Sequence, residues 1–279
     1  MARDTPPVPA AGATPVVRRR DTGQPSPPPV TVSPSPRETS DLPAALEVLA
    51  REAARLGLAL DPQQLDRFER LIVALRRDKA RVSLTSLVDP VDIAVKHFLD
   101  SLTVLLALPE GTTTLIDIGT GAGFPGLPLK IARPSLRCTL VEATEKKAAW
   151  VQQTAAELGL SHVEVLAARA EDVGHDPAYR GRFDVAAARA VAPVAVLCEL
   201  CLPFVRPGGR LIAQKTIAGA GVEVPAAANA LRVLGARLVE VRPVNSPVLP
   251  NRVLVVIEQV GRVPDAYPRR AGIPSKRPL

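Results

Sequence analysis

Three glycines on alternate positions give this chain a backbone that a ligand could approach closely: Gly119, Gly121 and Gly123. They follow directly on the apolar run Leu115–Ile118, which is typical of a buried strand of a parallel sheet and has the acidic Asp117 near its end. Glycine permits a positive φ and carries no Cβ, so a ligand can lie against the main chain. Pro125 then suits the first turn of a helix. This order of strand, glycine turn and helix predicts the nucleotide-binding start of a doubly wound sheet.

The spacing of the glycines distinguishes between nucleotide ligands. The dinucleotide fingerprint G-x-G-x-x-G requires a glycine where this chain has Phe124, so a pyrophosphate would be crowded at the helix start. S-adenosylmethionine has no phosphate and does not need that space. A second strand-like run, Cys138–Val141, ends at Glu142, whose carboxylate could accept two hydrogen bonds from a ribose diol. Together with Asp117, these residues predict a site for S-adenosyl-L-methionine, and a glycine-rich turn beside a surface acid remains the alternative.

Further polar residues are expected at the same edge of the sheet. Ala170 and Glu171 follow the third predicted strand, at a position that often meets the adenine ring in S-adenosylmethionine domains. Arg189 and Lys215 each follow directly on a later predicted strand, and the carboxyl ends of parallel strands border the ligand crevice. Two cations there suit an anionic substrate. The alternatives are a solvated acidic turn at Glu171 and cations that only balance the neighbouring acids.

Upstream of the glycine loop, apolar residues recur at helical spacing, and three helices are predicted: residues 42–56, 62–75 and 90–105. The third helix would place His97, Asp100 and Ser101 on one face, because they fall at i, i+3 and i+4. A basic loop is predicted between the second and third helices, with four cationic residues: Arg76, Arg77, Lys79 and Arg81. We treat His97 and Asp100 as candidates for substrate handling, although a structural histidine and a solvated turn would account for the same pattern.

Seven strands are predicted: residues 115–118, 138–141, 163–166, 183–188, 211–214, 238–241 and 253–257. Helices are expected over residues 146–158 and 222–234, with a tight turn at residues 207–209 and a final hairpin formed by the last two strands. This order predicts an α/β chain with the class I (Rossmann-like) S-adenosylmethionine-dependent methyltransferase fold. The sheet would be seven-stranded and mostly parallel, with a small N-terminal helical addition.

Composition divides the chain into four expected segments. Residues 1–40 hold ten of the 29 prolines and few large apolar groups, so they cannot offset their ordering entropy and are expected to be disordered. Residues 41–110 would form a helical cap, and residues 111–260 the methyltransferase domain. Residues 261–279 form a basic tail whose composition suits contact with an RNA backbone, with disordered decoration as the alternative.

The charge balance points to an anionic partner. The net charge is +7 and the pI about 9.8, so nucleic acid is the first candidate. Cys198 and Cys201 form a C-x-x-C, but a zinc site needs four ligands and the three histidines have no matching spacing. We therefore expect no metal and two small buried side chains, with a redox role as the minor alternative. Without a long apolar run or a signal peptide, we expect a cytoplasmic protein that does not enter the membrane.

Several motifs in combination resemble the RsmG (GidB) family: LTS-x-x-DP…KHFLDSL from Leu84 to Leu102, DIGTGAGFPGLPL from Asp117 to Leu129, ARAED from Ala168 to Asp172, AARA from Ala187 to Ala190, and PRRAGIPSKRPL from Pro268 to Leu279. The resemblance extends from about residue 43 to the end. It implies a small-subunit ribosomal RNA methyltransferase that modifies N7 of a guanine in the 530 loop of 16S rRNA. It also implies the small ribosomal subunit or its precursor as partner, and we expect a monomer.

The resemblance places ligand contacts at five positions: Gly119, Phe124, Ala170, Glu171 and Arg189. Two departures concern RNA contacts. Family members often carry Trp-Asn and Tyr-Asn before Leu-Thr, where this chain has Asp78, Lys79, Val82 and Ser83. They also often carry Lys-Gly where this chain has Lys215-Thr216. Both changes leave the predicted donor loop intact.

Guanine N7 has an in-plane lone pair and no proton, so its methylation needs neither a general base nor a covalent intermediate. The chain has no D/N-P-P-Y/F motif for an exocyclic amine and no Pro-Cys nucleophile for pyrimidine C5. We therefore expect Asp117 to orient the methionine end of the donor, Glu142 to bind the ribose, and Arg189 with Lys215 to hold the guanosine or its phosphates. A small-molecule methyltransferase and a non-catalytic RNA-binding ribosome-assembly factor remain the alternatives.

Overall fold

The computed structural model describes residues 41–279, and the expected Pro-rich tail of residues 1–40 lies outside them. Within this part, seven strands form one sheet: β1 (Thr114–Ile118), β2 (Arg137–Glu142), β3 (Val163–Ala167), β4 (Phe183–Arg189), β5 (Val205–Thr216), β6 (Ala236–Pro243) and β7 (Arg252–Gln259). Their order is β3-β2-β1-β4-β5-β7-β6, with β1 to β5 parallel and β7 antiparallel to both of its neighbours. The predicted seven-stranded, mostly parallel sheet with a final hairpin is confirmed.

The central strands of the sheet are buried on both faces, as their nearly continuous apolar sequences require, whereas the edge strand β6 is largely exposed. Alternate residues of a strand point to opposite faces. Leu115 of β1 accordingly packs in one hydrophobic core, while Ile116 and Ile118 pack in the other. Val185 and Ala186 divide β4 in the same way. The fold is therefore a sheet between two helical layers, and its carboxyl strand ends form one shared edge.

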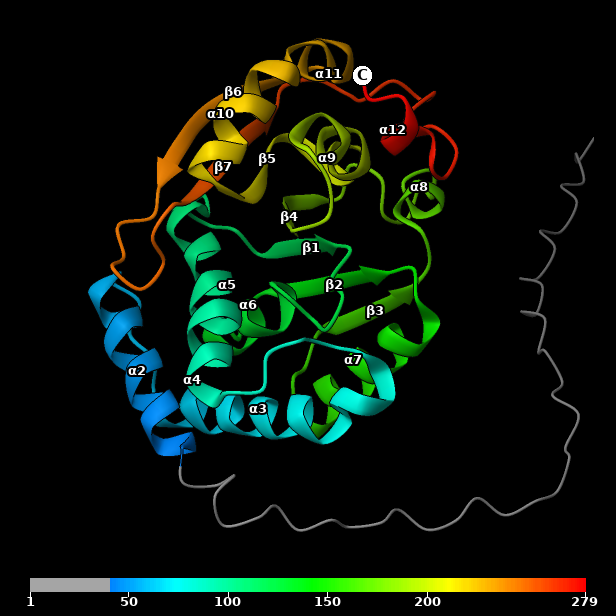
Figure 1. The fold of residues 1–279 in the computed structure, drawn as a ribbon. Helices are drawn as coiled ribbons and strands as arrows, with labels where there is room; N and C mark the ends of the chain where they lie inside the picture. Colours follow the sequence, from blue (N-terminus) through cyan, green and yellow to red (C-terminus); the bar gives the residue numbers. More distant parts are fainter. Residues whose placement is uncertain (1–40) are drawn as a thin grey trace, which may run out of the picture. The chain divides into compact units, whose positions relative to one another are not determined.

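Helices cover the two faces in separate groups (Figure 1). The first core contains α2 (Leu42–Arg55), α3 (Pro62–Val82), α6 (Gly126–Ala132) and α7 (Glu145–Glu157). The second contains α9 (Val194–Cys201), α10 (Ile217–Ala226) and α11 (Ala228–Leu234), with the short α8 (Ala170–Val173) beside them. In Figure 1 the first group begins in blue and cyan, and α10 and α11 are yellow.

Helix α3 is longer than the sequence pattern indicated. It starts with a capping box, in which Asp61 Oδ1 accepts from the Gln64 amide at 2.8 Å and Gln64 Oε1 accepts from the Asp61 amide at 2.8 Å. It then continues to Val82, so the predicted basic loop at 76–81 is wrong: those residues occupy the last helical turns. The buried Asp78 carboxylate explains the extension, because it accepts a hydrogen bond from Trp150 of α7 at 3.0 Å and fixes the end of α3 there.

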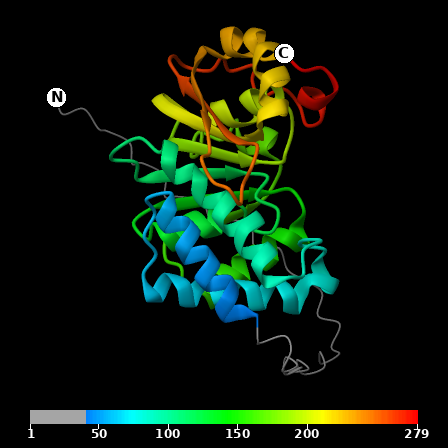
Figure 2. The same cartoon turned by 60° about the vertical axis from the view of Figure 1, so that its left-hand side comes forward.

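The predicted third helix consists of four short segments: α4 (Pro90–Ile93), a π-helix (Ala94–Leu99), α5 (Asp100–Leu102) and a 3₁₀ turn (Thr103–Ala107). In Figure 2 this run lies alongside the blue helix α2. The wider π turn changes which side chains face the sheet, and π segments occur frequently at functional sites. It lies beside the carboxyl strand ends, and it contains His97.

Two further boundaries differ from the sequence prediction. Gly209 lies inside β5 rather than in a tight turn, and its backbone packs so closely on β4 that a Cβ would lie 2.6 Å from the Asp184 carbonyl oxygen. The predicted helix over residues 222–234 is instead the pair α10 and α11, which meet at an angle of 55° directly after Pro225. Proline lacks an amide hydrogen and clashes with the preceding turn, so a bend there is expected.

The described part of the chain has no single helix that is both long and apolar enough to cross a bilayer, although α10 and α11 taken together as a bent pair reach that length and composition.

The C-terminal segment packs on the body and is not loose decoration. Arg269 forms an ion pair with Glu199 of α9, with Nη2 2.6 Å from Oε2 and Nε 2.8 Å from Oε1. Arg180 donates to main-chain carbonyl oxygens of Val263, Pro264 and Tyr267. The short helix α12 (Ile273–Lys276) ends this segment, drawn in red beside α8 and α9 in Figure 1.

We predict that Arg269→Ala lowers the free energy of unfolding by about 3 kcal/mol in urea titrations, because the fully buried Glu199 carboxylate loses its cation. Arg262→Ala is the matched control. Its partner Asp265 is exposed, so its loss should cost less than about 1 kcal/mol. Equal losses in the two variants would contradict a packed C-terminal segment.

Candidate functional site

The glycine loop has the backbone geometry that the sequence predicted. Gly119, Gly121 and Gly123 have φ values of +71°, +60° and +88°, in the left-handed region. The buried Asp117 joins both ends of the loop: its Oδ2 accepts from Thr120 Oγ1 at 2.6 Å and from the Gly126 amide at 2.8 Å. The loop is therefore held in one conformation by a carboxylate at the end of β1.

The same carboxylate retains an unused acceptor. Asp117 Oδ1 is buried and has no hydrogen-bond partner among the described residues. Burial raises the pKa of Asp117 to about 6, against the opposing effects of Thr120, Gly126 and Arg189. A buried acid with a free oxygen fits a positively charged ligand, which would stabilise its ionised form. The methionine end of an S-adenosylmethionine molecule carries such charge.

Glu142 ends β2 beside the middle of the loop. Its Oε2 accepts from the Gly121 amide at 3.0 Å, and its Oε1 accepts from the Thr144 amide at 2.8 Å. Each carboxylate oxygen has a further lone pair for a hydroxyl group. A Cβ built on Gly121 would meet nothing nearer than the Gly119 carbonyl oxygen at 4.0 Å, so open space lies above this glycine. These residues fit the nucleoside part of the predicted donor.

Ala170 and Glu171 begin α8 after β3, at the same edge of the sheet. Glu171 Oε1 accepts a hydrogen bond from the Gly272 amide at 3.0 Å. Glu171, the predicted adenine contact, is therefore hydrogen-bonded to the C-terminal segment, and no local sequence pattern predicted this bond. The adenine role itself stays a prediction.

Arg189, the last residue of β4, is brought together with His97 and Asp100. Its Nη1 donates to Asp100 Oδ2 at 3.3 Å and to the Lys96 carbonyl oxygen at 3.1 Å, and its Nη2 lies 3.3 Å from His97 Nδ1. Arg252 of β7 contacts the other Asp100 oxygen at 3.2 Å. Burial raises the pKa of Asp100, while Arg252 and Arg189 oppose that rise. Burial also lowers the pKa of His97 to about 4, assisted by Arg189, so its ring is neutral at pH 7.

Phe124 connects this cluster to the glycine loop. Its ring stacks on His97 with centroids 4.6 Å apart, and the Arg189 guanidinium lies 5.0 Å from its centroid. The residue that argues against a dinucleotide thus supplies an aromatic surface that positions a cation and an imidazole.

Lys215 lies inside β5 and not beyond its end, and its ammonium has protein partners. Nζ donates to the Ala192 carbonyl oxygen at 2.6 Å and pairs with Glu223 Oε2 at 2.6 Å. The Val194 amide donates to the same Glu223 oxygen at 3.0 Å. Lys215 therefore stabilises the segment that follows Arg189 and connects β4 to α9. Direct contact with guanosine stays a prediction.

Four residues of the site were missed at the sequence level: Thr85, Thr120, Gly126 and Arg252. A Cβ on Gly126 would lie 2.9 Å from Asp117 Oδ2, so this glycine is required by close helix–strand packing. The third glycine of a nucleotide-binding fingerprint allows this close packing, so the glycine pattern could have identified Gly126. The pairing of β7 with β5 brings Arg252 to the site, and no local sequence pattern predicts that position.

The C-x-x-C pair lies in the core of the fold, on α9. Cys198 and Cys201 are buried on α9 with free thiols, as two small core residues. Burial raises the pKa of Cys198 to about 12, which disfavours the reactive thiolate. Among residues 41–279, no group of three His, Cys, Asp or Glu side chains is placed to hold a metal ion.

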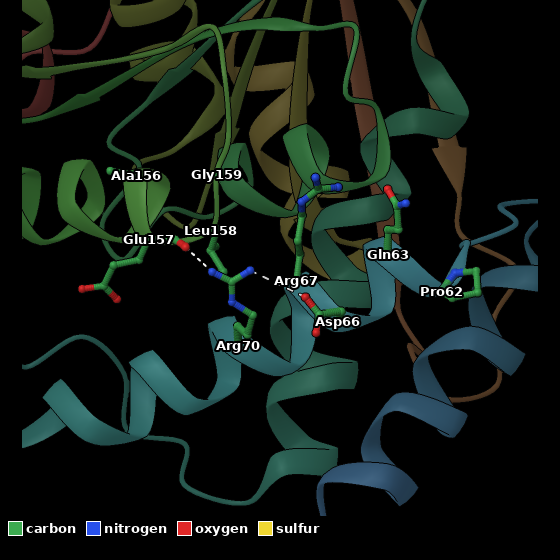
Figure 3. Close-up of a pocket in the computed structure, with 9 residues that line it drawn as sticks. All are labelled: Pro62, Gln63, Asp66, Arg67, Arg70, Ala156, Glu157, Leu158 and Gly159. Carbon is green, nitrogen blue, oxygen red and sulfur yellow. Dashed lines mark hydrogen bonds and ion pairs between the residues drawn. The ribbon is translucent and has the colours of Figure 1, made fainter. Parts of the chain in front are cut away.

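A surface hollow of about 510 Å³ lies away from the glycine loop, between the start of α3 and the end of α7. Figure 3 shows Arg70 of α3 pointing toward the C-terminal end of α7, with Asp66 beside it and Arg67 also lining the hollow. Arg70 donates to the Glu157 carbonyl oxygen and lies 3.6 Å from Asp66. Arg70 is already balanced by the C-terminal end of α7 and by an acid, so we do not place the site here.

Comparison with known proteins gives consistent matches over most of the chain. Two proteins named ribosomal RNA small subunit methyltransferase G are similar: that of Roseiflexus sp. (strain RS-1), 46% identical over 84% of this chain and 100% of the relative, and that of Deinococcus radiodurans, 44% identical over 85% and 94%. A solved SAM-dependent methyltransferase from Aquifex aeolicus is 20% identical, covers 62% of this chain and 94% of that one, and has a TM-score of 0.46. The model of the GidB family, described as rRNA small subunit methyltransferase G, matches residues 64–247. The chain therefore belongs to the GidB family of S-adenosylmethionine-dependent rRNA small subunit methyltransferases.

Proposed function

We propose that this protein transfers a methyl group from S-adenosyl-L-methionine to N7 of a guanine in the 530 loop of 16S rRNA. The observation that carries the proposal is the Arg189 cluster at the carboxyl strand ends, which offers fixed donors and an imidazole whose pKa of about 4 makes it a weak base. The small ribosomal subunit or its precursor is the proposed partner. A monomeric, cytoplasmic enzyme remains our prediction.

The donor supplies an electrophilic methyl group, and the protein's task is to orient it. We assign Asp117 to the methionine end, Glu142 to the ribose, and Ala170 with Glu171 to the adenine. Gly119, Gly121 and Gly123 leave the backbone open to the ligand, and Phe124 closes the loop. Positioning of this kind can lower a barrier by about 7–11 kcal/mol.

The substrate side contains Arg189, which has five N–H donors, of which its contacts with Lys96, Asp100 and His97 use three. The remaining donors can bind an oxygen of the guanosine or its phosphate. Guanine N7 has no proton to lose, so the neutral His97 ring need not accept one. This favours N7 over an exocyclic amine or a hydroxyl group, both of which lose a proton on methylation.

A separate observation argues against each of the two alternative functions, the small-molecule methyltransferase and the non-catalytic assembly factor. A small-molecule methyltransferase would not need the exposed basic residues on either side of Gly272, such as Arg270 and Lys276. A non-catalytic assembly factor would not need Asp117 and Glu142 to hold an open glycine loop. Both observations support the rRNA methyltransferase.

The decisive experiment is tritium transfer from labelled donor to 30S subunits and to free 16S rRNA, followed by nucleoside mapping. We expect an alkali-labile product, because 7-methylguanosine is cationic. At saturating donor and RNA, the single-turnover rate should be flat from about pH 7 to 9, since His97 stays neutral and Arg189 stays charged. A stable product with a basic limb in the rate profile would overturn the N7 assignment.

We predict that Gly121→Val abolishes donor binding in isothermal titration, because the side chain would occupy the open space above the loop. Gly57→Val is the control. Gly57 has φ +77° with nothing near its Cβ, so it carries a comparable backbone strain of about 1–2 kcal/mol away from the site. Unchanged donor affinity in Gly121→Val, with a folded protein, would refute the loop assignment.

The C-terminal residues Arg270 and Lys276 are exposed beside the adenine end of the site, and we predict that they contact RNA phosphates. Replacing either with alanine should reduce the slope of log affinity against log salt by about 0.7–0.9. Arg137→Ala is the control, because Arg137 starts β2 at the opposite edge of the sheet from Glu142. An unchanged slope in both test variants would remove this segment from the RNA interface.

A further inference from the structure

His97 contacts three other parts of the site: the glycine loop, the end of β4 and the segment before α4. Its ring stacks on Phe124 of the glycine loop, and its Nδ1 lies 3.3 Å from Arg189 Nη2. On the other side, its Nε2 lies 2.6 Å from Thr85 Oγ1, in the segment between α3 and α4. Thr85 Oγ1 also accepts from the Leu87 amide at 3.1 Å. Both ring nitrogens are thus engaged, by different elements.

The chemistry of the partners fixes the tautomer. The Lys96 carbonyl oxygen also contacts the ring and could accept from a ring N–H, but it already accepts from Arg189 Nη1. A guanidinium has N–H donors and no acceptor, so Nδ1 presents its lone pair to Arg189. A neutral imidazole has one proton, which must then be on Nε2 and point to Thr85 Oγ1. Thr85 is therefore an acceptor from both His97 and Leu87, and the hydrogen bonds run in one direction, from Arg189 to the ring and from the ring to Thr85.

We propose that His97 is a positioning residue, which in its Nε2–H tautomer holds the Arg189 guanidinium in place for the substrate, while Thr85 locks that tautomer. Arg189 is otherwise held by the Asp100 carboxylate and the Lys96 carbonyl oxygen, which lie on the same helical run as His97. His97 supplies the contact to the second terminal nitrogen, so it sets the rotation of the guanidinium plane. The role deepens the proposed function and rests on it for the identity of what Arg189 binds.

The charges around the ring favour the neutral state that this role requires. Arg189 on β4 faces Nδ1 directly, and a protonated Nδ1 would present a second donor to it. Asp100 on α5 faces Arg189 and Arg252 of β7 as an ion-pair partner of both, and Lys96 pairs with Asp92. Protonation would therefore break the contact with Arg189.

Two substitutions separate positioning from simple space filling. The amide oxygen of His97→Asn can replace Nδ1 as the acceptor for Arg189, whereas the amide N–H of His97→Gln can replace Nε2–H as the donor to Thr85. Glutamine is closer to histidine in size, so a merely structural role predicts that Gln is the better substitute. Positioning predicts the reverse order, with kcat/KM for RNA about tenfold higher in His97→Asn than in His97→Gln, the scale of a hydrogen bond to a charged group. Equal activities, or higher activity in Gln, would refute the proposal.

The tautomer is tested independently of turnover. The chain has three histidines, so two-bond ¹H–¹⁵N correlation spectra of histidine-labelled protein can be assigned by the signal lost in His97→Gln. We expect the Nε2–H pattern for His97 at about pH 7, and a Nδ1 resonance that moves in Arg189→Lys. An Nδ1–H tautomer would refute the proposal even if the enzyme methylates RNA. The expected spectrum without any RNA methylation would instead refute the proposed function and leave the His97–Arg189 contact standing.

Discussion

The buried carboxylate of Asp117 is the constraint on which the rest of the site depends. One of its oxygens ties Thr120 and Gly126 across the glycine loop, and the other has no partner among the described residues. Its pKa is raised from 3.8 to about 6, so ionisation is less favourable in the folded chain than in the unfolded chain. The free energy of unfolding therefore falls as the pH rises through that interval. A cationic ligand would offset this cost, which explains why a fold would retain such an acid at a donor site.

The two cations of the site, Arg189 and Lys215, are held by protein partners, although the sequence analysis treated them as free to bind a substrate. Arg189 is held by Asp100, by a carbonyl oxygen and by His97, and Lys215 is held by Glu223 and by Ala192. Neither cation has to be ordered when a substrate arrives, so the entropy of fixing a long side chain is spent during folding. For the proposed transfer to guanine N7, which needs orientation rather than proton transfer, this is the more useful arrangement.

Sequence patterns predicted the sheet because its strands are apolar on both faces, and they predicted the glycine loop because its backbone needs positive φ values. They failed where tertiary contacts override local pattern. The charged end of α3 remained helical because buried Asp78 bonds to Trp150, seventy-two positions away. Ser101 follows His97 by one helical turn, and its hydroxyl donates to the His97 carbonyl oxygen four residues back, so this hydroxyl is used within the helical run. Arg252 and Thr85 could not be found at all, since strand pairing and a loop conformation bring them to the site.

The C-terminal segment shows why the location of a basic tail matters more than its composition. Its residues pack on α9 through the Arg269–Glu199 pair, and its Gly272 amide reaches Glu171 at the proposed adenine end of the site. A phosphate bound by the exposed Arg270 would thus lie two residues from a donor-side contact. Movement of this segment on RNA binding would change the hydrogen bond to Glu171, and reciprocity requires that donor binding then changes RNA affinity by the same factor. If both proposed contacts form, the segment is a physical link between the two substrates rather than an independent RNA-binding extension.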